Sequence, residues 1–350
     1  MRLATTLASL LLAAGVAHAS TADAIQNANR LMQKYTGNVP GASLLVLKDG
    51  KPLLGRGYGM ADLEHHVAAS PATDYRLASV TKQFTAAAIL LLAQDGKLKL
   101  DDSIRHWLPT LPAFTDKVTL RELLCHTGGL LDYEDLIPPG ATRQLNDQDV
   151  LRMIAATTHG YFPPGTAYRY SNTGFVLLGL VVEKASGLSL QDFLARRIFQ
   201  PLHMDHTLLY VHDGRTVPNR AYGYSETNGR WQRTDQDLTS ATRGDGGIYS
   251  NIDDLAKWDA ALYDDRLLSD ASRKLAFSPH AKVVGEPYQA DYGYGWRITG
   301  DTLWHSGESI GFRNVIVRWP KQHLTVILLS NRNDPEPYRT VLAIAEPFLH

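Results

Sequence analysis

Residues 77–84 read Leu-Ala-Ser-Val-Thr-Lys-Gln-Phe, and the rest of the chain is interpreted outward from them. The apolar run at 84–95 predicts a buried helix that ends before Gly96, a residue common just after helices. Positions three apart share one face of a helix, so we expect Lys82 beside Ser79. A serine hydroxyl becomes nucleophilic when a base takes its proton, and a buried lysine with a lowered pKa is such a base. The spacing therefore indicates a nucleophilic serine.

The same spacing has a purely structural interpretation. Ser79 also suits the N-cap position of the helix, which would leave Lys82 on the surface of its first turn. Ser-x-x-Lys occurs by chance in many chains of this length. The remaining sequence therefore has to decide between a nucleophile and a cap.

The composition is that of an ordinary globular protein. The 350 residues are 44% hydrophobic and 20% charged, which suits one large domain or two interleaved lobes. The formal net charge of -1 gives no electrostatic basis for a nucleic-acid partner. Cys125 is the single cysteine, so no internal disulfide is expected, and its apolar neighbours indicate a core residue.

The first residues have the pattern of a cleavable signal peptide. Arg2 supplies a positive start, followed by an apolar run at 7–16 and a small-x-small site, Ala-His-Ala, at 17–19. We expect residues 1–19 to be removed and a single domain, residues 20–350, to be periplasmic or secreted. The apolar run is too short to span a bilayer and no later run is long enough, so no membrane span is expected in the mature chain.

The order of predicted elements indicates an α+β fold with two lobes. A hairpin lies near the start, helices fill the middle, and strands joined by short turns return near the end, which implies antiparallel pairing. Both chain ends therefore supply one antiparallel sheet flanked by helices, in a sheet lobe of about 20–75 and 265–350. A mostly helical lobe of about 76–264 is inserted, and we expect the site in the cleft between the lobes. The predicted helices span residues 21–35, 84–95, 119–127, 146–157, 172–185, 189–200, 253–263 and 336–349, and the predicted strands span 42–47, 52–58, 292–298, 301–305, 312–319 and 324–330.

Three short motifs are expected to meet at that cleft. The first is Ser79 with Lys82. The second is Tyr-Ser-Asn at 170–172, in a loop after a Pro-Pro-Gly run and before an apolar helix. The third is His-Ser-Gly at 305–307, between two β segments. Together they offer a hydroxyl, an amine and a phenol for acid–base chemistry.

Taken singly, each residue also has a structural interpretation: Tyr170 as a loop aromatic, Asn172 as a helix N-cap, His305 as an ordinary strand histidine. In this order, however, the motifs resemble the serine β-lactamase and penicillin-binding-protein superfamily, in its class C β-lactamase, D-alanyl-D-alanine carboxypeptidase and esterase branch. The resemblance covers about residues 25–345. Flanking stretches strengthen it: LLCHTGGL at 123–130, Pro-Gly at 164–165 and GGIYS at 246–250.

The resemblance implies a role for each matching residue. Ser79 is the acylated nucleophile, and Lys82 and Tyr170 share the proton transfers, because a phenol beside an ammonium has a lowered pKa. Such acid–base help is worth about 10²–10⁴-fold in rate. Asn172 positions Lys82 and the substrate amide, and the backbone N–H groups of Ser79 and Glu308 form the oxyanion hole. The implied substrate-binding residues are Asn172, His305, Ser306, Gly307 and Glu308.

One position departs from the family pattern. β-Lactamases and carboxypeptidases usually have lysine where this chain has His305, and an unperturbed histidine, with a pKa of about 6.5, is mostly neutral at pH 7. With Glu308 nearby, this weakens the site for the carboxylate of β-lactams and acyl-D-Ala-D-Ala termini. Histidine at this place is known in the esterase and D-aminopeptidase branches, so we expect hydrolysis of esters or small amides. Arg313 and Arg243 are candidates to replace the missing cation.

Two alternatives stay open: a β-lactamase or D-alanyl-D-alanine carboxypeptidase acting on β-lactams or cell-wall peptides, and a non-catalytic penicillin or peptide sensor.

A Gly-x-Ser-x-Gly match at 307–311 resembles the nucleophile elbow of α/β-hydrolases, but that elbow leads into a helix and a strand is predicted after Ser309. No cofactor or metal is expected, since acyl transfer of this kind needs none and no His-Glu-x-x-His spacing occurs. The expected partner is a small-molecule or short peptide substrate. The leaving group and the oligomeric state are left open.

Overall fold

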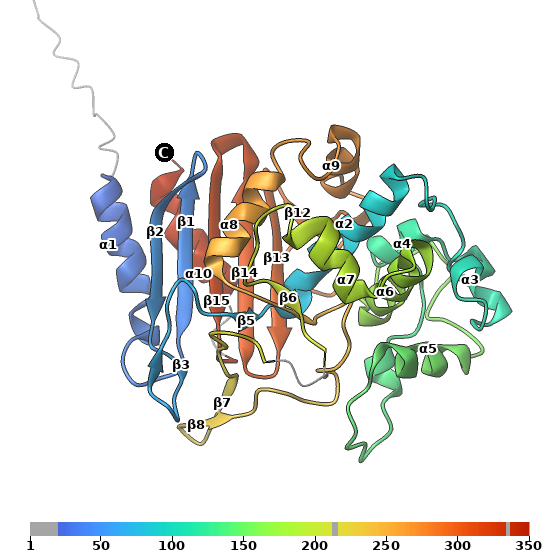
Figure 1. The fold of residues 1–350 in the computed structure, drawn as a ribbon, viewed down its shortest axis with the longest axis horizontal. Coiled ribbons are helices and arrows are strands. Elements are labelled where there is room, and N and C mark those ends of the chain that lie inside the picture. Colours follow the sequence, from blue (N-terminus) through green and yellow to red (C-terminus); the bar gives the residue numbers. More distant parts are fainter. Residues whose placement is uncertain (1–19, 212–215, 334–336, 350) are drawn as a thin grey trace, which may run out of the picture.

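The computed structural model describes residues 20–211, 216–333 and 337–349 (Figure 1), so the predicted signal peptide lies outside the described residues. Its largest sheet has eight antiparallel strands in the order β10-β11-β12-β13-β14-β15-β1-β2. β1 pairs with β2 on one side and with β15 on the other, where Ala42 lies opposite Ser330. The predicted α+β fold, with one sheet built from both chain ends, is confirmed. The strands are β1 (Ala42–Lys48), β2 (Lys51–Tyr58), β10 (Ala281–Lys282), β11 (Asp291–Tyr292), β12 (Arg297–Thr299), β13 (Thr302–Ser309), β14 (Phe312–Trp319) and β15 (Leu324–Ser330).

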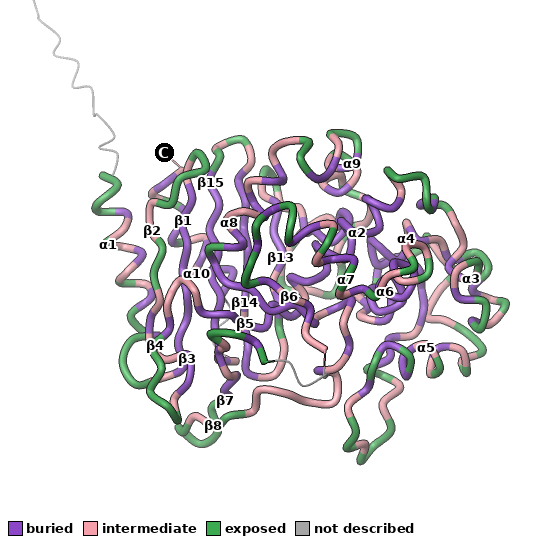
Figure 2. Tube along the Cα trace, in the orientation of Figure 1, coloured by how far each residue is buried: buried purple, intermediate pink, exposed green. Residues whose placement is uncertain are grey.

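Alternating side chains explain why this sheet is covered on both faces. In β1, Leu44 and Val46 belong to one apolar cluster, whereas Leu45 belongs to the other. In β15, Val326 and Ile327 divide in the same way. Successive side chains of a strand lie on opposite faces, so an unbroken apolar run needs a partner on each side. Figure 2 shows the central strands buried along their length.

Helices supply the two covering layers. α1 (Thr21–Leu31) and α10 (Pro337–Ala345) pack on one face, through residues such as Ala28 and Val341. α2 (Thr81–Gln94) and α8 (Ile252–Ala261) belong to the cluster on the other face. α1 begins with a capping box between Ser20 and Asp23, which satisfies backbone N–H groups that have no partner within the helix.

The helical part of the molecule is built around α2 and α6 (Asn172–Ser186), which pack together and are almost wholly buried. Each is followed by a glycine with positive φ: Gly96 at +68°, where the sequence predicted the end of the helix, and Gly187 at +73°. Within the described ranges, no single helix is long and apolar enough to cross a membrane. One pair of helices joined by a bend, α6 with Leu190–Phe199, is long and apolar enough when the two are taken together, by length and composition only. The other helices are α3 (Ile104–Trp107), α4 (Leu120–Leu124), α5 (Asp147–Ala155), α7 (Leu190–Leu194) and α9 (Asp270–Ala276).

Short strands occur inside the region predicted to be mostly helical. β5, β9 and β6 form a small sheet, and the N–H of Leu77 donates to the carbonyl of Ile248 at 2.8 Å just after it. Strands of two or three residues are too short to show alternation in a sequence. The division into lobes near residues 75 and 265 stays a prediction. The short strands in or at the edge of this region are β5 (Tyr75–Arg76), β6 (Leu208–Leu209), β7 (Tyr224–Thr227), β8 (Arg230–Arg233) and β9 (Ile248–Ser250), and two more precede it, β3 (Met60–Asp62) and β4 (Val67–Ala68).

The prediction of one strand over 292–298 is wrong. β11 ends at Tyr292, β12 begins at Arg297, and the two pair as a hairpin in which Gly293 N–H donates to Trp296 O at 2.8 Å. Gly295 has a φ of +75°, which a glycine adopts without strain and which lets the chain reverse here. The helix predicted over 119–127 is also shorter, since α4 ends at Leu124.

Candidate active site

Ser79 sits in a 3₁₀ turn, Ala78–Val80, immediately before α2, rather than within the helix itself. The turn begins at Ala78, whose φ of +48° is unusual for a residue with a side chain. β9 holds it in place, because Ile248 accepts a hydrogen bond from Leu77 and donates one to the Thr81 hydroxyl. The serine is half-buried and its side chain is reachable from a pocket.

Lys82 lies in the first turn of α2 and is fully buried. Its Nζ is 2.9 Å from Ser79 Oγ, 2.7 Å from Asn172 Oδ1 and 3.0 Å from the carbonyl oxygen of Asp245. The last two oxygens only accept, so two of its N–H groups point to them. The third position on Nζ faces Ser79, as a proton in the ammonium and as a lone pair in the amine. Lys82 can therefore take up or return the serine proton without moving.

Asn172 connects this group to an acid that the sequence motifs do not include. Its Nδ2 donates to Glu134 Oε1 at 2.8 Å, which turns Oδ1 toward Lys82. Asn172 is the first residue of α6 rather than its N-cap, and its backbone N–H is bound by Asp132 Oδ2 at 2.6 Å. The two roles that competed for this side chain are thus separated, since Asp132 serves the helix end and Asn172 serves Lys82.

Tyr170 lines the same pocket as Ser79. Lys82 Nζ lies 5.0 Å from the centre of its ring, in cation–π contact. In the described part of the chain its hydroxyl makes no hydrogen bond to Ser79 or to Lys82. Catalytic hydrogen bonds are often long in the absence of a substrate and tighten in the complex. The structure therefore places the phenol at the site, with the predicted proton contact still to be made.

The third motif lies in β13, against the turn that carries Ser79. A Cβ on Gly307 would stand 2.0 Å from the carbonyl oxygen of Leu77 and 3.2 Å from the backbone nitrogen of Val80. Only glycine allows this approach of strand and turn. The next residue, Glu308, lines the same pocket as Ser79. Its N–H as the second donor stays a prediction.

His305 is a buried and neutral residue, 1% exposed. Its Nδ1 lies 2.6 Å from the carbonyl oxygen of Ser306, so this nitrogen carries the hydrogen, and Nε2 accepts from the Tyr292 hydroxyl at 2.8 Å. Burial, followed by the positive charges of Arg297 and Lys82, lowers its pKa well below the ordinary value. Both ring nitrogens are used within the protein, so His305 offers a substrate no cation.

Two arginines line the pocket, and each is held by a glutamate. Arg297, which the sequence analysis missed, forms a bidentate ion pair with Glu286. Arg313 pairs with Glu308 at 2.5 Å. Arg243, the other predicted replacement for the lysine, lines a different hollow and pairs with Asp147 at 2.7 Å.

Glu134 is the exception among these charges. In the described part of the chain no lysine, arginine or histidine lies within ion-pair distance of it. Partial desolvation, and then the carboxylates of Asp132 and Asp245, raise the pKa of Glu134 to about 7. It lies in a surface turn two residues after Asp132, and nothing in that spacing showed that the turn faces Asn172.

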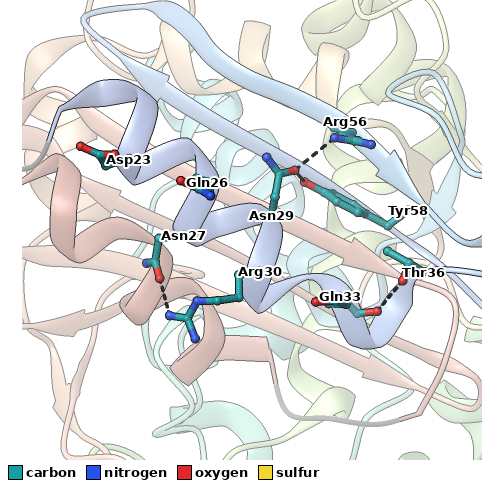
Figure 3. A pocket seen from close by; sticks show the side chains of 9 residues that line it. All are labelled: Asp23, Gln26, Asn27, Asn29, Arg30, Gln33, Thr36, Arg56 and Tyr58. Atoms are coloured by element: carbon teal, nitrogen blue, oxygen red, sulfur yellow. Dashed lines mark hydrogen bonds between the residues drawn. The ribbon is translucent and has the colours of Figure 1, made fainter.

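The pocket lined by Ser79, Tyr170, Asn172 and Glu134 has a volume of about 510 Å³. Its walls come from the turn before α2, the start of α6, β13 and β14, together with Trp304 and Tyr288. A larger hollow of about 670 Å³ lies between α1 and β2, where the polar side chains mostly bind one another, as Tyr58 and Arg56 do with Asn29 (Figure 3). None of the predicted site residues lies there.

The structure also bears on Ser309 as an alternative nucleophile and on a metal site. Ser309 of the Gly-x-Ser-x-Gly match ends β13, and β14 begins at Phe312, so the match joins strand to strand and lacks the geometry of a nucleophile elbow. Over the residues with described placement, no group of three or more His, Cys, Asp or Glu side chains could hold a metal ion.

Known proteins resemble this chain along most of its length. A family model described as Beta-lactamase matches residues 25–347. Penicillin-binding protein 4* of Bacillus subtilis (strain 168) is 34% identical over 329 residues, which are 88% of this chain and 72% of that protein.

Solved structures extend the likeness. The octameric penicillin-binding protein homologue from Pyrococcus abyssi superposes with a TM-score of 0.82 at 26% identity, over 94% of this chain and 78% of that one. The D-amino acid amidase from Ochrobactrum anthropi SV3, solved with L-phenylalanine amide, has a TM-score of 0.77 at 26% identity, over 93% of this chain and 97% of that one.

Proposed function

The chain belongs to the Beta-lactamase family, as its three motifs predicted, and from that premise we propose that it is a serine hydrolase that cleaves esters or small amides through a covalent acyl-enzyme. Support for the covalent route comes from Ser79, which is hydrogen-bonded to Lys82 at the wall of a pocket. Asn172 and the carbonyl of Asp245 orient the lysine toward the serine.

The reaction divides into two transfers of one acyl group. Ser79 Oγ bonds to the acyl carbon as its proton passes to Lys82 or Tyr170, and that group then gives the proton to the alcohol or amine whose bond to carbon breaks. Water then attacks the acyl-serine and gives a proton to Tyr170. The bond between Ser79 Oγ and the acyl carbon breaks, Oγ takes this proton back, and the acid leaves. In both steps the backbone N–H groups of Ser79 and Glu308 stabilise the negative charge on the carbonyl oxygen.

The observation that carries the choice of substrate is the pairing of charges around the pocket. A β-lactam or an acyl-D-Ala-D-Ala terminus brings a carboxylate, which needs a cation to replace its lost hydration. Here His305 is neutral, and Arg297 and Arg313 already bind Glu286 and Glu308. A neutral ester or amide makes no such demand, so it is the better substrate.

The test compares a short-chain nitrophenyl ester with a chromogenic cephalosporin, on wild type, Ser79→Ala and the matched control Ser309→Ala. We expect a higher kcat/KM for the ester, no activity above background in the Ser79 variant, and near wild-type activity in the Ser309 variant. Faster turnover of the cephalosporin would favour the β-lactamase alternative. Mass spectrometry with a fluorophosphonate or penicillin would reveal a sensor, as a label on Ser79 that does not turn over.

Glu134 favours a second, narrower candidate: an amidase or esterase whose substrates carry a positive charge near the acyl carbon. Its carboxylate faces the pocket beside Asn172 and has no cation within ion-pair distance among the described residues. An ammonium group of the substrate would supply that missing partner. The D-amino acid amidase that superposes on the chain is a relative solved with an amino-acid amide.

A further inference from the structure

The stretch 123–130 carries part of the family resemblance but no step of the proposed chemistry. Its His126 follows α4, is 3% exposed, and has a φ of +62°. That backbone conformation is uncommon for a residue with a side chain. The ring nitrogen Nε2 is also buried with no hydrogen-bond partner in the described residues. An apolar side chain would fill the same space without burying a polar nitrogen that has no hydrogen bond, so packing alone does not account for a histidine.

The histidine holds the backbone on both sides of Tyr170. Arg169 N–H donates to the carbonyl oxygen of His126 at 3.0 Å, and Ser171 N–H donates to its Nδ1 at 3.2 Å. Only an unprotonated Nδ1 accepts a hydrogen bond, so the ring is neutral with its hydrogen on Nε2. Burial, and then the positive charge of Lys82, lowers the pKa of His126 well below its ordinary value, which keeps this acceptor available.

The imidazole also supports the phenol. Its centre lies 4.3 Å from the centre of the Tyr170 ring at an angle of 36°, and Tyr292 packs against it at 4.5 Å. Lys82 Nζ contacts the same phenol ring at 5.0 Å. The Tyr170 side chain is therefore held by its flanking N–H groups and by its ring neighbours, which limits how far the hydroxyl can swing from Ser79.

We propose that His126 is a positioning residue for Tyr170: through its carbonyl and its Nδ1 it binds the N–H groups before and after the tyrosine, and so keeps the phenol in place for proton transfer. The inference rests on the proposed function, because it gives His126 no chemistry of its own. It assigns a role to the first residue of the His-Thr-Gly-Gly stretch at 126–129, which the proposed mechanism does not use.

Two substitutions separate the acceptor from the ring. In His126→Asn the side-chain oxygen takes the position of Nδ1, one bond beyond Cγ, and asparagine tolerates positive φ, so the bond from Ser171 is kept while the ring is lost. In His126→Phe the ring is kept and the acceptor is lost. The readouts are kcat and KM for a short-chain nitrophenyl ester, and Tm as the measure of stability.

We expect kcat of the Phe variant to fall by about 10²-fold with KM within about twofold, because a small displacement of a catalytic group costs this much. The Asn variant should keep kcat within about threefold of wild type, even where its Tm is the lower of the two. If kcat instead follows Tm in both variants, or if the Phe variant keeps the wild-type kcat, the positioning role is wrong.

A fluorophosphonate probe distinguishes this failure from failure of the proposed function, since it acylates an active serine whatever the natural substrate is. Wild-type protein that is not labelled at Ser79 overturns both proposals. Wild-type protein that is labelled at Ser79, with the Phe variant labelled at the same rate, overturns the role of His126 alone. Slow labelling of the Phe variant beside fast labelling of the Asn variant supports it.

Discussion

The two walls of the pocket differ in how their charged side chains are paired. The helical wall consists of Ser79, Glu134, Tyr170 and Asn172. Behind it, Lys82 is buried among oxygens that orient it toward Ser79, and its hydrogen bonds lead through Asn172 to Glu134. This series of hydrogen bonds ends at the carboxylate of Glu134, which faces the pocket. Among the described residues, no cation lies within ion-pair distance of it.

On the opposite wall, the sheet wall, the charged groups Arg297 and Arg313 are each paired with a glutamate within the protein. Both ring nitrogens of His305 are hydrogen-bonded to protein atoms. In the proposed function, the helical wall holds the connected groups that break the bond. On the sheet wall, Arg297 and Arg313 are each paired with a glutamate among the described residues, so this wall suits a substrate without a carboxylate.

The largest effect is expected from removing the amine of Lys82, which lies behind the helical wall. Lys82→Met should lower kcat for a nitrophenyl ester by about 10⁴-fold, the upper range for acid–base catalysis, because Ser79 loses the amine that takes up its proton. Circular dichroism should show a folded protein, although Asn172 and Asp245 lose their donor. A folded variant with more than a tenth of wild-type activity would contradict the assignment.

The phenol should matter less than the amine. Tyr170→Phe keeps the ring contacts with His126 and Lys82 but removes the hydroxyl, and we expect kcat to fall by about 10²-fold with an unchanged Tm. Pre-steady-state kinetics would show whether acylation, deacylation or both are slowed. A Phe variant with wild-type kcat would leave the proton work to Lys82 alone.

Glu134 tests the electrostatic half of the comparison. Nitrophenyl esters of trimethylammonioacetic acid and 3,3-dimethylbutyric acid share a shape, and only the first carries a permanent positive charge. Glu134→Gln keeps an acceptor for Asn172 and should lower the ratio of their kcat/KM values by about tenfold at pH 8.

The pH dependence of that ratio follows from the raised pKa of Glu134, about 7. Above pH 7 the carboxylate is charged and favours the cationic ester; below pH 7 it is protonated and the preference declines. The charge of the ester does not titrate, so the Gln variant should give a flat ratio from pH 5.5 to 8. The same slope in both proteins would exclude Glu134 as its source.

The smallest effect is expected at the rim of the sheet wall. The Glu308 side chain is 70% exposed, so its pair with Arg313 is largely screened by water. Glu308→Gln should change the free energy of unfolding by less than about 0.5 kcal/mol and leave ester hydrolysis within about twofold. Inhibition by simple carboxylates should strengthen slightly, since the carboxylate of Glu308 no longer competes for Arg313. A large loss of stability would show that this pair carries more of the fold than its exposure indicates.

Much of this arrangement was open to prediction from the sequence. The apolar runs of β1 and β15 and the glycines after α2 and α6 are local signals, and each element formed where its pattern indicated. The three motifs were also local, so Ser79, Lys82 and Tyr170 could be named before their distances were known. The strand expected over 292–298 was wrong, because two glycines with an aromatic between them are equally compatible with a strand and with a turn.

The residues that the sequence did not reveal share one property: their role depends on what faces them. Glu134 and Arg297 are ordinary charged residues until the chain folds and places them around the pocket. His126 lay within a stretch noted for its resemblance, but its hydrogen bonds go to a loop more than forty positions away. No periodicity encodes such a pairing, since it is set by how two loops meet.

The place of β1 in the sheet has a consequence for how the chain is made. Ala42 pairs with Ser330 and Lys48 with Leu324, so a strand synthesised early has to await one synthesised near the end. Until then the first hairpin exposes an apolar edge with unsatisfied N–H and C=O groups, which other chains can pair with. A ribosome that stalls before residue 324 would release a fragment prone to aggregate, even though most of the pocket had already been translated.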